Sequence, residues 1–425
     1  MHRLAVALAF VFGLIAGGNA SAASQDDIKA AVLKTYGDIA QAIFEDSLIS
    51  ARNLQKTISA LVAAPSEAKL KAAREAWIAA RVPYMQSEVF RFGNVVVDEW
   101  EGRVNAWPLD EGLIDYVDAD RYGEESDENP LYTANVIANK QIKFGGKVLD
   151  ATKIDWKLLR KLHEVGGVEA NVATGYHAIE FLLWGQDLNG TRQGAGNRPW
   201  TDYAKQGCTN GNCDRRAQYL AVATQMLVDD LAWMVRQWQA DGSARKALTE
   251  KGLDAGIGAI LTGLGSLSYG ELAGERMKLG LLLHDPEEEQ DCFSDNTHNA
   301  HYYDVAGMLN VYGGEYKRIN GSLVKGQGMT HLVRVVAPDL DTEMRGKLKA
   351  TIDAFSAIKQ RAETRESYDQ MIGEGNAEGN ALVQAGIDRL TDQTKTLERV
   401  VAALKLKATF EGSDSLDAPD KVGRK

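Results

Sequence analysis

Apolar side chains recur every three or four residues along most of the chain. In residues 26–63, for example, Ile28, Val32, Tyr36 and Ile39 follow this spacing. It is the period of a helix that buries one face, whereas a half-buried strand would alternate apolar and polar residues. The pattern therefore predicts one long amphipathic helix over this segment.

Further helices follow from the same spacing. Pro65-Ser66 interrupts the first pattern, and a second helix is expected over residues 67–92, kinked at Pro83 because proline removes a backbone donor. The later helices are expected over residues 215–238, 338–362 and 380–404. No segment shows the alternation of a convincing strand, so the sequence predicts an all-α protein of long helices, as in up-and-down bundles.

Residues 252–283 are rich in glycine and apolar side chains. A membrane span is excluded because Glu271, Glu275 and Arg276 interrupt the apolar run. A dinucleotide-binding loop is excluded because the sequence GLGSLS lacks the third glycine and follows no strand. We expect a tightly packed buried helix, whose charged groups must be paired or bind something to offset their burial.

Two connecting segments, about residues 96–155 and 185–214, are long for loops, and such loops commonly line or cover a site. The second contains Cys208 and Cys213 in the Gly/Asn-rich sequence GCTNGNC. An oxidising compartment favours a disulfide between them. A zinc knuckle is disfavoured because no further Cys or His lies close by. Residues 408–425 are expected to form a polar, solvated tail.

The N-terminal residues have the pattern of an export signal. A basic start at His2 and Arg3 precedes an apolar run that ends in Ala-Ser-Ala at residues 20–22, which signal peptidase recognises. We expect residues 1–22 to be removed, which places the mature protein in the periplasm or cell envelope without a membrane span. An uncleaved N-terminal anchor is the alternative.

Composition narrows the classes of partner. The chain has 48 Lys and Arg against 59 Asp and Glu, a formal net charge of −11. Nucleic acids and anionic membranes are bound through clustered positive charge, and no basic block occurs here. Small cations are the more natural partners. A mature chain of about 400 residues is long enough for two or three domains.

The sequence GYHAIEFLLWG, residues 175–185, places His177 and Glu180 on one face of an expected helix. Nitrogen and oxygen donors together suit iron or zinc, but two ligands hold an ion weakly. The inverted HxxEH peptidase motif would need histidine where Phe181 stands. Taken alone, the pair also fits an ordinary helix. Gly175 and the apolar surroundings favour a buried pair that can be approached closely.

Three other segments combine ionisable and aromatic residues. The sequence CFSDNTHNAHYYD repeats the His-x-x-acid spacing at His301 and Asp304, although a capped helix start explains it equally well. The sequence EVFR places Glu88 three residues before Arg91, as in a structural ion pair. The loop WPLDEGLIDY, residues 107–116, is dense in acids for a linker and indicates a pocket wall.

Together these segments resemble the imelysin-like family, also classed as imelysin peptidases, which are exported bacterial proteins named for insulin cleavage. The resemblance rests on EVFRFG from Glu88, AWPLDEGLIDY from Ala106, GxHxxE from Gly175 and DCFSDNTH from Asp291. It implies two four-helix-bundle-like domains related by duplication, residues 23–213 with the GxHxxE motif and residues 214–407.

The resemblance also implies a pocket near the interface of the two domains. His177 and Glu180 are expected at its centre as metal ligands, with Glu88 as a further ligand. Cys292 is read as a buried structural thiol, because the sequence places no base beside it. The residues expected to line the pocket are Arg91, Gly175, Trp107, Asp110, Glu111, Asp295, His298 and Arg276.

Members of the family are often iron-regulated, and related domains occur in bacterial iron-uptake lipoproteins. We therefore expect an envelope protein that binds iron, or alternatively zinc, and serves iron acquisition with iron-uptake or redox proteins as partners. A metallopeptidase would need an open coordination position, a bound water and a general base. Glu180 cannot be that base if it is a ligand. A metal-free ligand-binding or partner-binding protein is the third interpretation.

Overall fold

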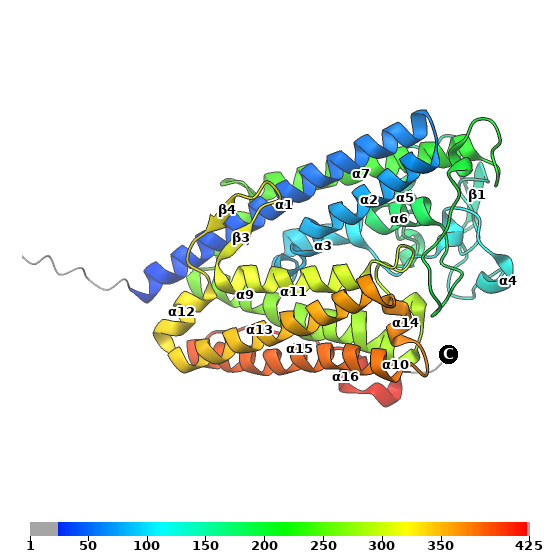
Figure 1. Ribbon diagram of the computed structural model, residues 1–425. Helices are drawn as coiled ribbons and strands as arrows, with labels where there is room; N and C mark the ends of the chain where they lie inside the picture. The colour runs from blue at the N-terminus through cyan, green and yellow to red at the C-terminus, as the bar shows by residue number, and fades with distance from the viewer. Residues whose placement is uncertain (1–23, 423–425) are drawn as a thin grey trace, which may run out of the picture.

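The computed structural model describes residues 24–422 (Figure 1). The expected export signal lies outside these residues. Helices dominate the described part of the chain, which confirms the predicted predominance of helix. No helix within residues 24–422 is long and apolar enough to cross a membrane.

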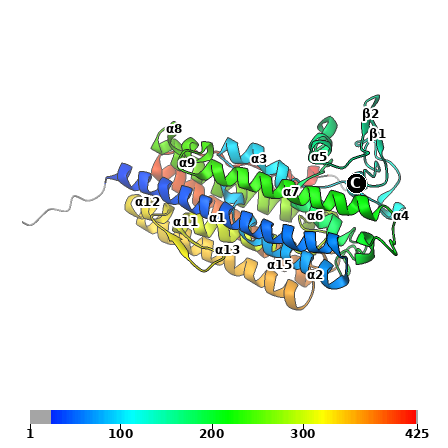
Figure 2. The ribbon, with the colours of Figure 1, turned by 90° about the horizontal axis from the view of Figure 1, so that it is seen from above.

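The first half of the chain is organised around α1 (Gln25–Ala63), which packs against α2 (Glu67–Met85) and α7 (Cys213–Trp238). Figures 1 and 2 both show α1 and α7 running side by side. The Ser66 side chain caps α2 by accepting a hydrogen bond from the Lys69 backbone. The prediction of a helix to residue 92 was too long, because α2 ends shortly after Pro83.

Short helices complete the first half. They are η1 (Glu88–Phe90), α3 (Val95–Asn105), η2 (Glu111–Leu113), α4 (Ala119–Tyr122), α5 (Trp156–Leu162), η3 (Val165–Gly167), α6 (Gly175–Trp184) and η4 (Trp200–Tyr203). Of these, α6 packs against α2, α3 and α7.

The second half contains α11 (Thr297–Gly313), α13 (Pro338–Thr364) and α15 (Ala377–Leu404), which form the lower layer in Figure 1. α13 packs between α11 and α15, and α11 also contacts α2. The other helices are α8 (Ser243–Glu250), α9 (Leu253–Ser266), η5 (Leu267–Lys278), α10 (Leu279–Leu283), η6 (Pro286–Glu288), α12 (Met329–Val336), α14 (Tyr368–Ile372), α16 (Asp414–Asp417) and η7 (Pro419–Lys421).

The Gly-rich segment is helical throughout, as α9, the π-helix η5 and α10. Its glycines allow close approach, since a Cβ at Gly270 would lie 2.7 Å from the Glu411 carbonyl oxygen. The segment after residue 408, expected to be a solvated tail, packs here in part. Ser415 is buried and its hydroxyl donates to the Gly274 carbonyl at 3.0 Å.

The expectation that strands are absent was wrong at two places. β1 (Gln141–Phe144) pairs with β2 (Lys147–Asp150), and β3 (Glu315–Lys317) pairs with β4 (Leu323–Lys325), both antiparallel. Strands this short do not produce a visible alternation of apolar residues. The two-glycine turn of the first hairpin, with φ of 55° and 73°, is the signal that would have identified it.

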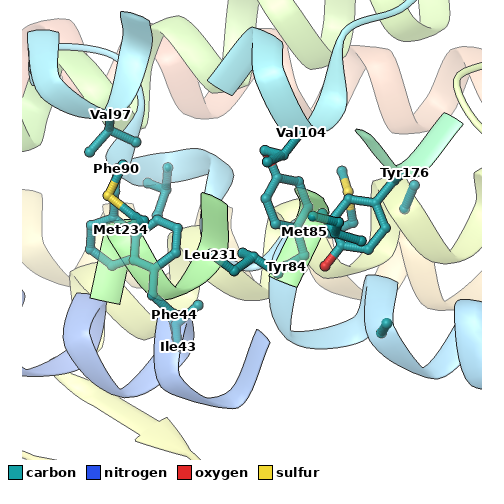
Figure 3. Packing of buried hydrophobic residues seen from close by; sticks show 14 of the residues in the cluster. Ile43, Phe44, Tyr84, Met85, Phe90, Val97, Val104, Tyr176, Leu231 and Met234 are labelled. Atoms are coloured by element: carbon teal, nitrogen blue, oxygen red, sulfur yellow. The ribbon is translucent and has the colours of Figure 1, made fainter. Parts of the chain in front are cut away.

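The buried apolar side chains form one continuous cluster that includes residues from both halves. Figure 3 shows part of it, where Tyr176 of α6 lies against Tyr84 of α2, with ring centroids 4.8 Å apart. This packing fixes α6 in the interior. The division into two domains, residues 23–213 and 214–407, and their duplication stay predictions.

Candidate metal centre

The start of α6 is held tightly against its neighbours. Gly175 has a φ of 90°, and a Cβ there would lie 2.5 Å from the Val104 carbonyl oxygen. Only glycine adopts this conformation readily and leaves room for the neighbouring backbone. The Trp77 indole N–H donates to the Tyr176 carbonyl at 2.9 Å. These contacts fix the direction in which the following side chains point.

His177 and Glu180 form a pair on α6, as the sequence predicted. The His177 Nδ1 atom lies 3.0 Å from Glu180 Oε2, and the two residues are 1% and 0% exposed. The other carboxylate oxygen, Oε1, accepts two hydrogen bonds from Ser294, one from its backbone N–H at 3.0 Å and one from its hydroxyl at 2.6 Å. Both oxygens of Glu180 are therefore fixed in position.

Asp291 is the third member of the cluster, from the segment that precedes α11. One potential ligand atom each from His177, Glu180 and Asp291 lies within 4.8 Å of the others, and all three residues are buried. The Arg81 guanidinium donates to Asp291 Oδ1 at 2.7 Å, and the Asn296 amide donates to Oδ2 at 2.8 Å. The site thus joins α2, α6 and the segment before α11.

The protonation states suit metal binding. Burial, with Arg81 and Arg276 nearby, holds the pKa of His177 well below its usual value, so the imidazole is neutral and can act as a ligand. Burial and the adjacent Asp291 raise the pKa of Glu180 well above its usual value. The His177 Nε2 atom is buried without a hydrogen-bond partner. A cation would compensate these desolvated groups and displace the proton of Glu180.

Glu88, expected as a further ligand, does not belong to this cluster. Its carboxylate accepts a hydrogen bond from Arg276 at 2.6 Å, and Arg276 also binds Glu271 at 2.5 Å and Asp304 at 3.1 Å. Of the charged groups predicted to point inward from the Gly-rich segment, Arg276 and Glu271 are thus paired with one another, whereas the prediction was wrong for Glu275, which is exposed. Arg276 is still close enough to act on the pKa of His177.

Arg91 takes part in the outer edge of the same ion network. It lies 3.1 Å from Asp98 and 3.4 Å from Glu271, rather than pairing with Glu88 as the helical spacing predicted. The reason is the tertiary surroundings, because the Glu88 carboxylate accepts its hydrogen bond from Arg276 instead. Spacing along the chain does not reveal such a competing partner.

The loop with Trp107, Asp110 and Glu111 lines a cleft of about 1370 Å³. Acidic side chains from other loops, including Asp187 and Glu287, share its wall. Burial and the neighbouring Glu287 raise the pKa of Glu111 to about 8. The structure therefore places these three residues at a cleft, and not in contact with His177.

Asp295 and His298 lie just beyond Asp291. Asp295 has a φ of 54° and belongs to a second group of carboxylates with Asp187 and Asp369. Burial lowers the pKa of His298 to about 4, and its Nε2 atom lies 3.0 Å from the Asn299 amide nitrogen. Cys292 is half-buried, and its raised pKa keeps it a thiol, which agrees with a non-nucleophilic role.

The predicted disulfide between Cys208 and Cys213 is present. It closes the loop that leads into α7, whose first residue is Cys213. The bond is consistent with an oxidising compartment.

Sequence reasoning missed Asp291, Arg81 and Ser294. Asp291 is the first residue of the segment DCFSDNTH. The sequence indicated two later residues of this segment, Asp295 and His298, as pocket residues. Its position is set by Arg81, from which it is 210 residues distant in the chain. Nothing in local spacing identifies such a pair, and only the location of Asp291 in that segment was a signal.

Comparison with known proteins places these features in context. A stretch of 60 residues is 37% identical to iron-regulated protein A of Synechococcus elongatus, and it covers 14% of this chain and 17% of that protein. The fold resembles the crystal structure of a Parabacteroides distasonis protein described as an iron-regulated protein A precursor. The TM-score is 0.62 at 18% identity, over 90% of this chain and 97% of that one.

At this identity the structural likeness concerns the fold alone. The family model described as imelysin matches residues 40–397, a range that includes GxHxxE, EVFRFG, AWPLDEGLIDY and DCFSDNTH. The chain therefore belongs to the imelysin family.

Proposed function

We propose that this protein binds an iron ion at His177, Glu180 and Asp291 and serves iron acquisition in the cell envelope. The observation that carries the proposal is the buried cluster itself, with its ligand atoms within 4.8 Å. The His177 Nδ1 atom lies 3.0 Å from Glu180 Oε2 and 4.0 Å from Asp291 Oδ1. Glu180 and Asp291 are both buried, and the Arg81 guanidinium alone does not balance two negative charges. A bound cation would offset the cost of burying the second carboxylate.

The donor set favours a transition metal over magnesium or calcium. One imidazole nitrogen and two carboxylate oxygens suit Fe²⁺ or Zn²⁺, whereas hard cations prefer oxygen alone. Arg81, Asn296 and Ser294 would hold the two carboxylates in place, as hydrogen-bonding groups around metal ligands commonly do. Iron is preferred to zinc because both similar proteins carry the name iron-regulated protein A.

The cellular setting is part of the proposal. The disulfide between Cys208 and Cys213 supports export to the periplasm or envelope. Three protein ligands would leave coordination positions for a small co-ligand or for transfer to a partner, such as an envelope iron-uptake or redox protein. A binding protein that releases its ion needs such an incomplete coordination shell.

A titration tests the proposal. The purified protein is stripped with a chelator and titrated with Fe²⁺ under anoxia and with Zn²⁺. His177→Ala is expected to abolish uptake at this site and to leave helicity unchanged. His331→Ala is the control, because that ring hydrogen-bonds only to the start of α12 and has no carboxylate partner. Equal affinity in the wild type and His177→Ala would overturn the proposal.

Peptidase activity is the second candidate, favoured by the family's description and by the cleft of about 1370 Å³. It is less well supported because His177 and Glu180 are buried and are not part of the cleft wall. Incubation with unfolded insulin, with and without a chelator, decides between the two. Cleavage that the chelator and Glu180→Ala both abolish would establish the peptidase.

A further inference from the structure

We propose a second cation site, formed by Asp187, Asp295, Asp369 and Glu289, that binds a hard, oxygen-preferring ion such as Mn²⁺ or Ca²⁺. It is separate from the His177 cluster and shares no ligand with it. The proposal goes beyond the proposed function, because it concerns a different set of ligands, all of them oxygen donors, which favour a hard ion.

The carboxylates come together from three separate parts of the chain. Asp187 follows α6, Asp295 precedes α11 and Asp369 lies in α14. One oxygen from each of these three lies within 4.8 Å of the others. Convergence from three elements differs from an acidic run along one loop, which would point its side chains to solvent.

Unpartnered oxygens provide the second observation. Glu289 and Asp369 are only 1% and 2% exposed, yet the oxygens of both carboxylates lack a hydrogen bond of normal geometry. The Ser367 side chain and the Gln370 backbone are close enough to Asp369 to lower its pKa, against the larger effect of burial. The Thr297 hydroxyl is close enough to Glu289 to lower its pKa slightly, against the larger effect of burial. Buried polar groups in native proteins nearly always have a hydrogen-bonding partner or a bound ion. We therefore expect a ligand at these oxygens.

Three of the four carboxylate residues, all but Asp295, line a small cavity. Asp187, Glu289 and Asp369 line it, together with Glu287, and its volume is about 10 Å³. That is close to the smallest space that accepts one water-sized particle. The cavity therefore has room for a single ion and not for an organic ligand.

The charged groups around the site are mostly acids, which favours a cation as the ligand. The charged groups that act most strongly on Asp295 are Asp369 and Asp187, which with burial raise its pKa to about 8. The main charge acting on Asp369 is again an acid, Asp187. Arg121 acts on Asp187 from the cleft side. Like charges this close cannot all ionise without a compensating ion.

Access is provided by the acidic cleft. Asp187, Glu287 and Cys292 line both the small cavity and the cleft of about 1370 Å³. The cleft wall is predominantly acidic, although Arg121 also lies on it. An opening in which one sign of charge predominates concentrates ions of the opposite sign. A cation from solvent would thus reach the four carboxylates along a wall that attracts it.

The experiment uses the full chain in a His177→Ala background, so that the first site does not contribute. Free Mn²⁺ is followed by its electron paramagnetic resonance signal while the chelator-stripped protein is titrated with MnCl₂. Loss of a group that supports a metal ligand typically lowers metal affinity roughly tenfold or more. Asp369→Asn removes a proposed ligand itself, so it should weaken Mn²⁺ binding by at least that factor. Asp187→Asn, at a half-buried position, provides a second test should Asp369→Asn fold poorly.

Glu374→Gln is the control, because Glu374 lies on the cleft wall and outside the small cavity. It should retain the Mn²⁺ affinity of the His177→Ala parent, and excess CaCl₂ should displace the bound Mn²⁺. Absence of Mn²⁺ binding in the parent would overturn the proposal. So would equal affinities in the parent and in folded Asp369→Asn and Asp187→Asn. Neither result depends on whether His177 binds iron.

Discussion

Ser294 donates two hydrogen bonds to a single oxygen of Glu180, although 114 residues separate them in the chain. The contact connects the segment before α11 with α6. It leaves the other oxygen of Glu180 directed at His177, 3.0 Å away. The orientation of the GxHxxE carboxylate is therefore set from the second half of the chain, by a residue of the DCFSDNTH segment.

Ser294→Ala should weaken metal binding without unfolding the protein. The hydroxyl lowers the pKa of Glu180, so its loss favours the protonated, non-ligating form. We expect a roughly 10–100-fold loss of affinity, as for other groups that orient a metal ligand. Titration with Fe²⁺ measures it, with Ser322→Ala in an exposed turn as control. An unchanged affinity would mean that Ser294 has no part in ion binding.

Arg81→Met should destabilise the metal-free protein by about 3–5 kcal/mol, because it leaves Asp291 buried without its charge partner. Bound metal would compensate Asp291 in place of the guanidinium. The rise in melting temperature on adding Zn²⁺ or Fe²⁺ should therefore be larger in Arg81→Met than in the wild type. An equal rise in both proteins would show that Asp291 does not meet the ion.

Gly175→Ala should be more destabilising than Gly145→Ala. Both glycines have positive φ, but Gly145 faces open space whereas a Cβ at Gly175 would lie 2.5 Å from the Val104 carbonyl oxygen. The left-handed conformation costs about 1–2 kcal/mol at either position. The clash adds roughly 1–3 kcal/mol at Gly175 alone. Urea unfolding of the two variants gives the difference, and equal losses would contradict the tight packing of α6.

The metal-free protein should lose stability as pH rises from about 6.5 to 8. The lower end is the ordinary pKa of histidine, and the upper end is the raised pKa of the Glu111 and Asp295 carboxyls. The pKa values of Glu111 and Asp295 are raised to about 8, so the folded protein holds protons that the unfolded chain has lost. Each such proton lowers the free energy of unfolding by about 1.4 kcal/mol per pH unit. His177 and His298, with lowered pKa values, are neutral in both states over most of this range.

Urea unfolding at several pH values in the presence of a chelator measures this slope. Glu111→Gln removes one of the raised groups and should make the slope shallower. A free energy of unfolding that rises with pH in the wild type would contradict the assignment of raised carboxyl pKa values. Added Mn²⁺ should flatten the slope, since it replaces the protons at Asp295.

The long helices were predictable because local periodicity determines them. The predicted bounds of α1, α7, α13 and α15 agree with the structure to within a few residues. The start of α2 was predictable as well, because Ser66 stands directly before this helix and caps it. The hairpins were missed because strands of three or four residues are too short to show a period.

The site was only half predictable for a different reason. His177 and Glu180 lie three residues apart on one helix, so spacing alone places them together. Asp291, Arg81 and the carboxylates of Asp187 and Asp369 meet through tertiary packing of distant segments. No local pattern in the sequence predicts such contacts. The ion pair between Glu88 and Arg276 is a long-range contact of the same kind, and it explains why Glu88 is not a member of the cluster.

The most direct test is the metal content of protein purified from the cell envelope without added metal. Elemental analysis of the wild type and of Glu180→Gln, which keeps the shape of the side chain and removes its charge, compares the two under identical conditions. We expect stoichiometric iron in the wild type and little or none in Glu180→Gln. Equal iron in both proteins, or a wild type without iron or zinc, would contradict it.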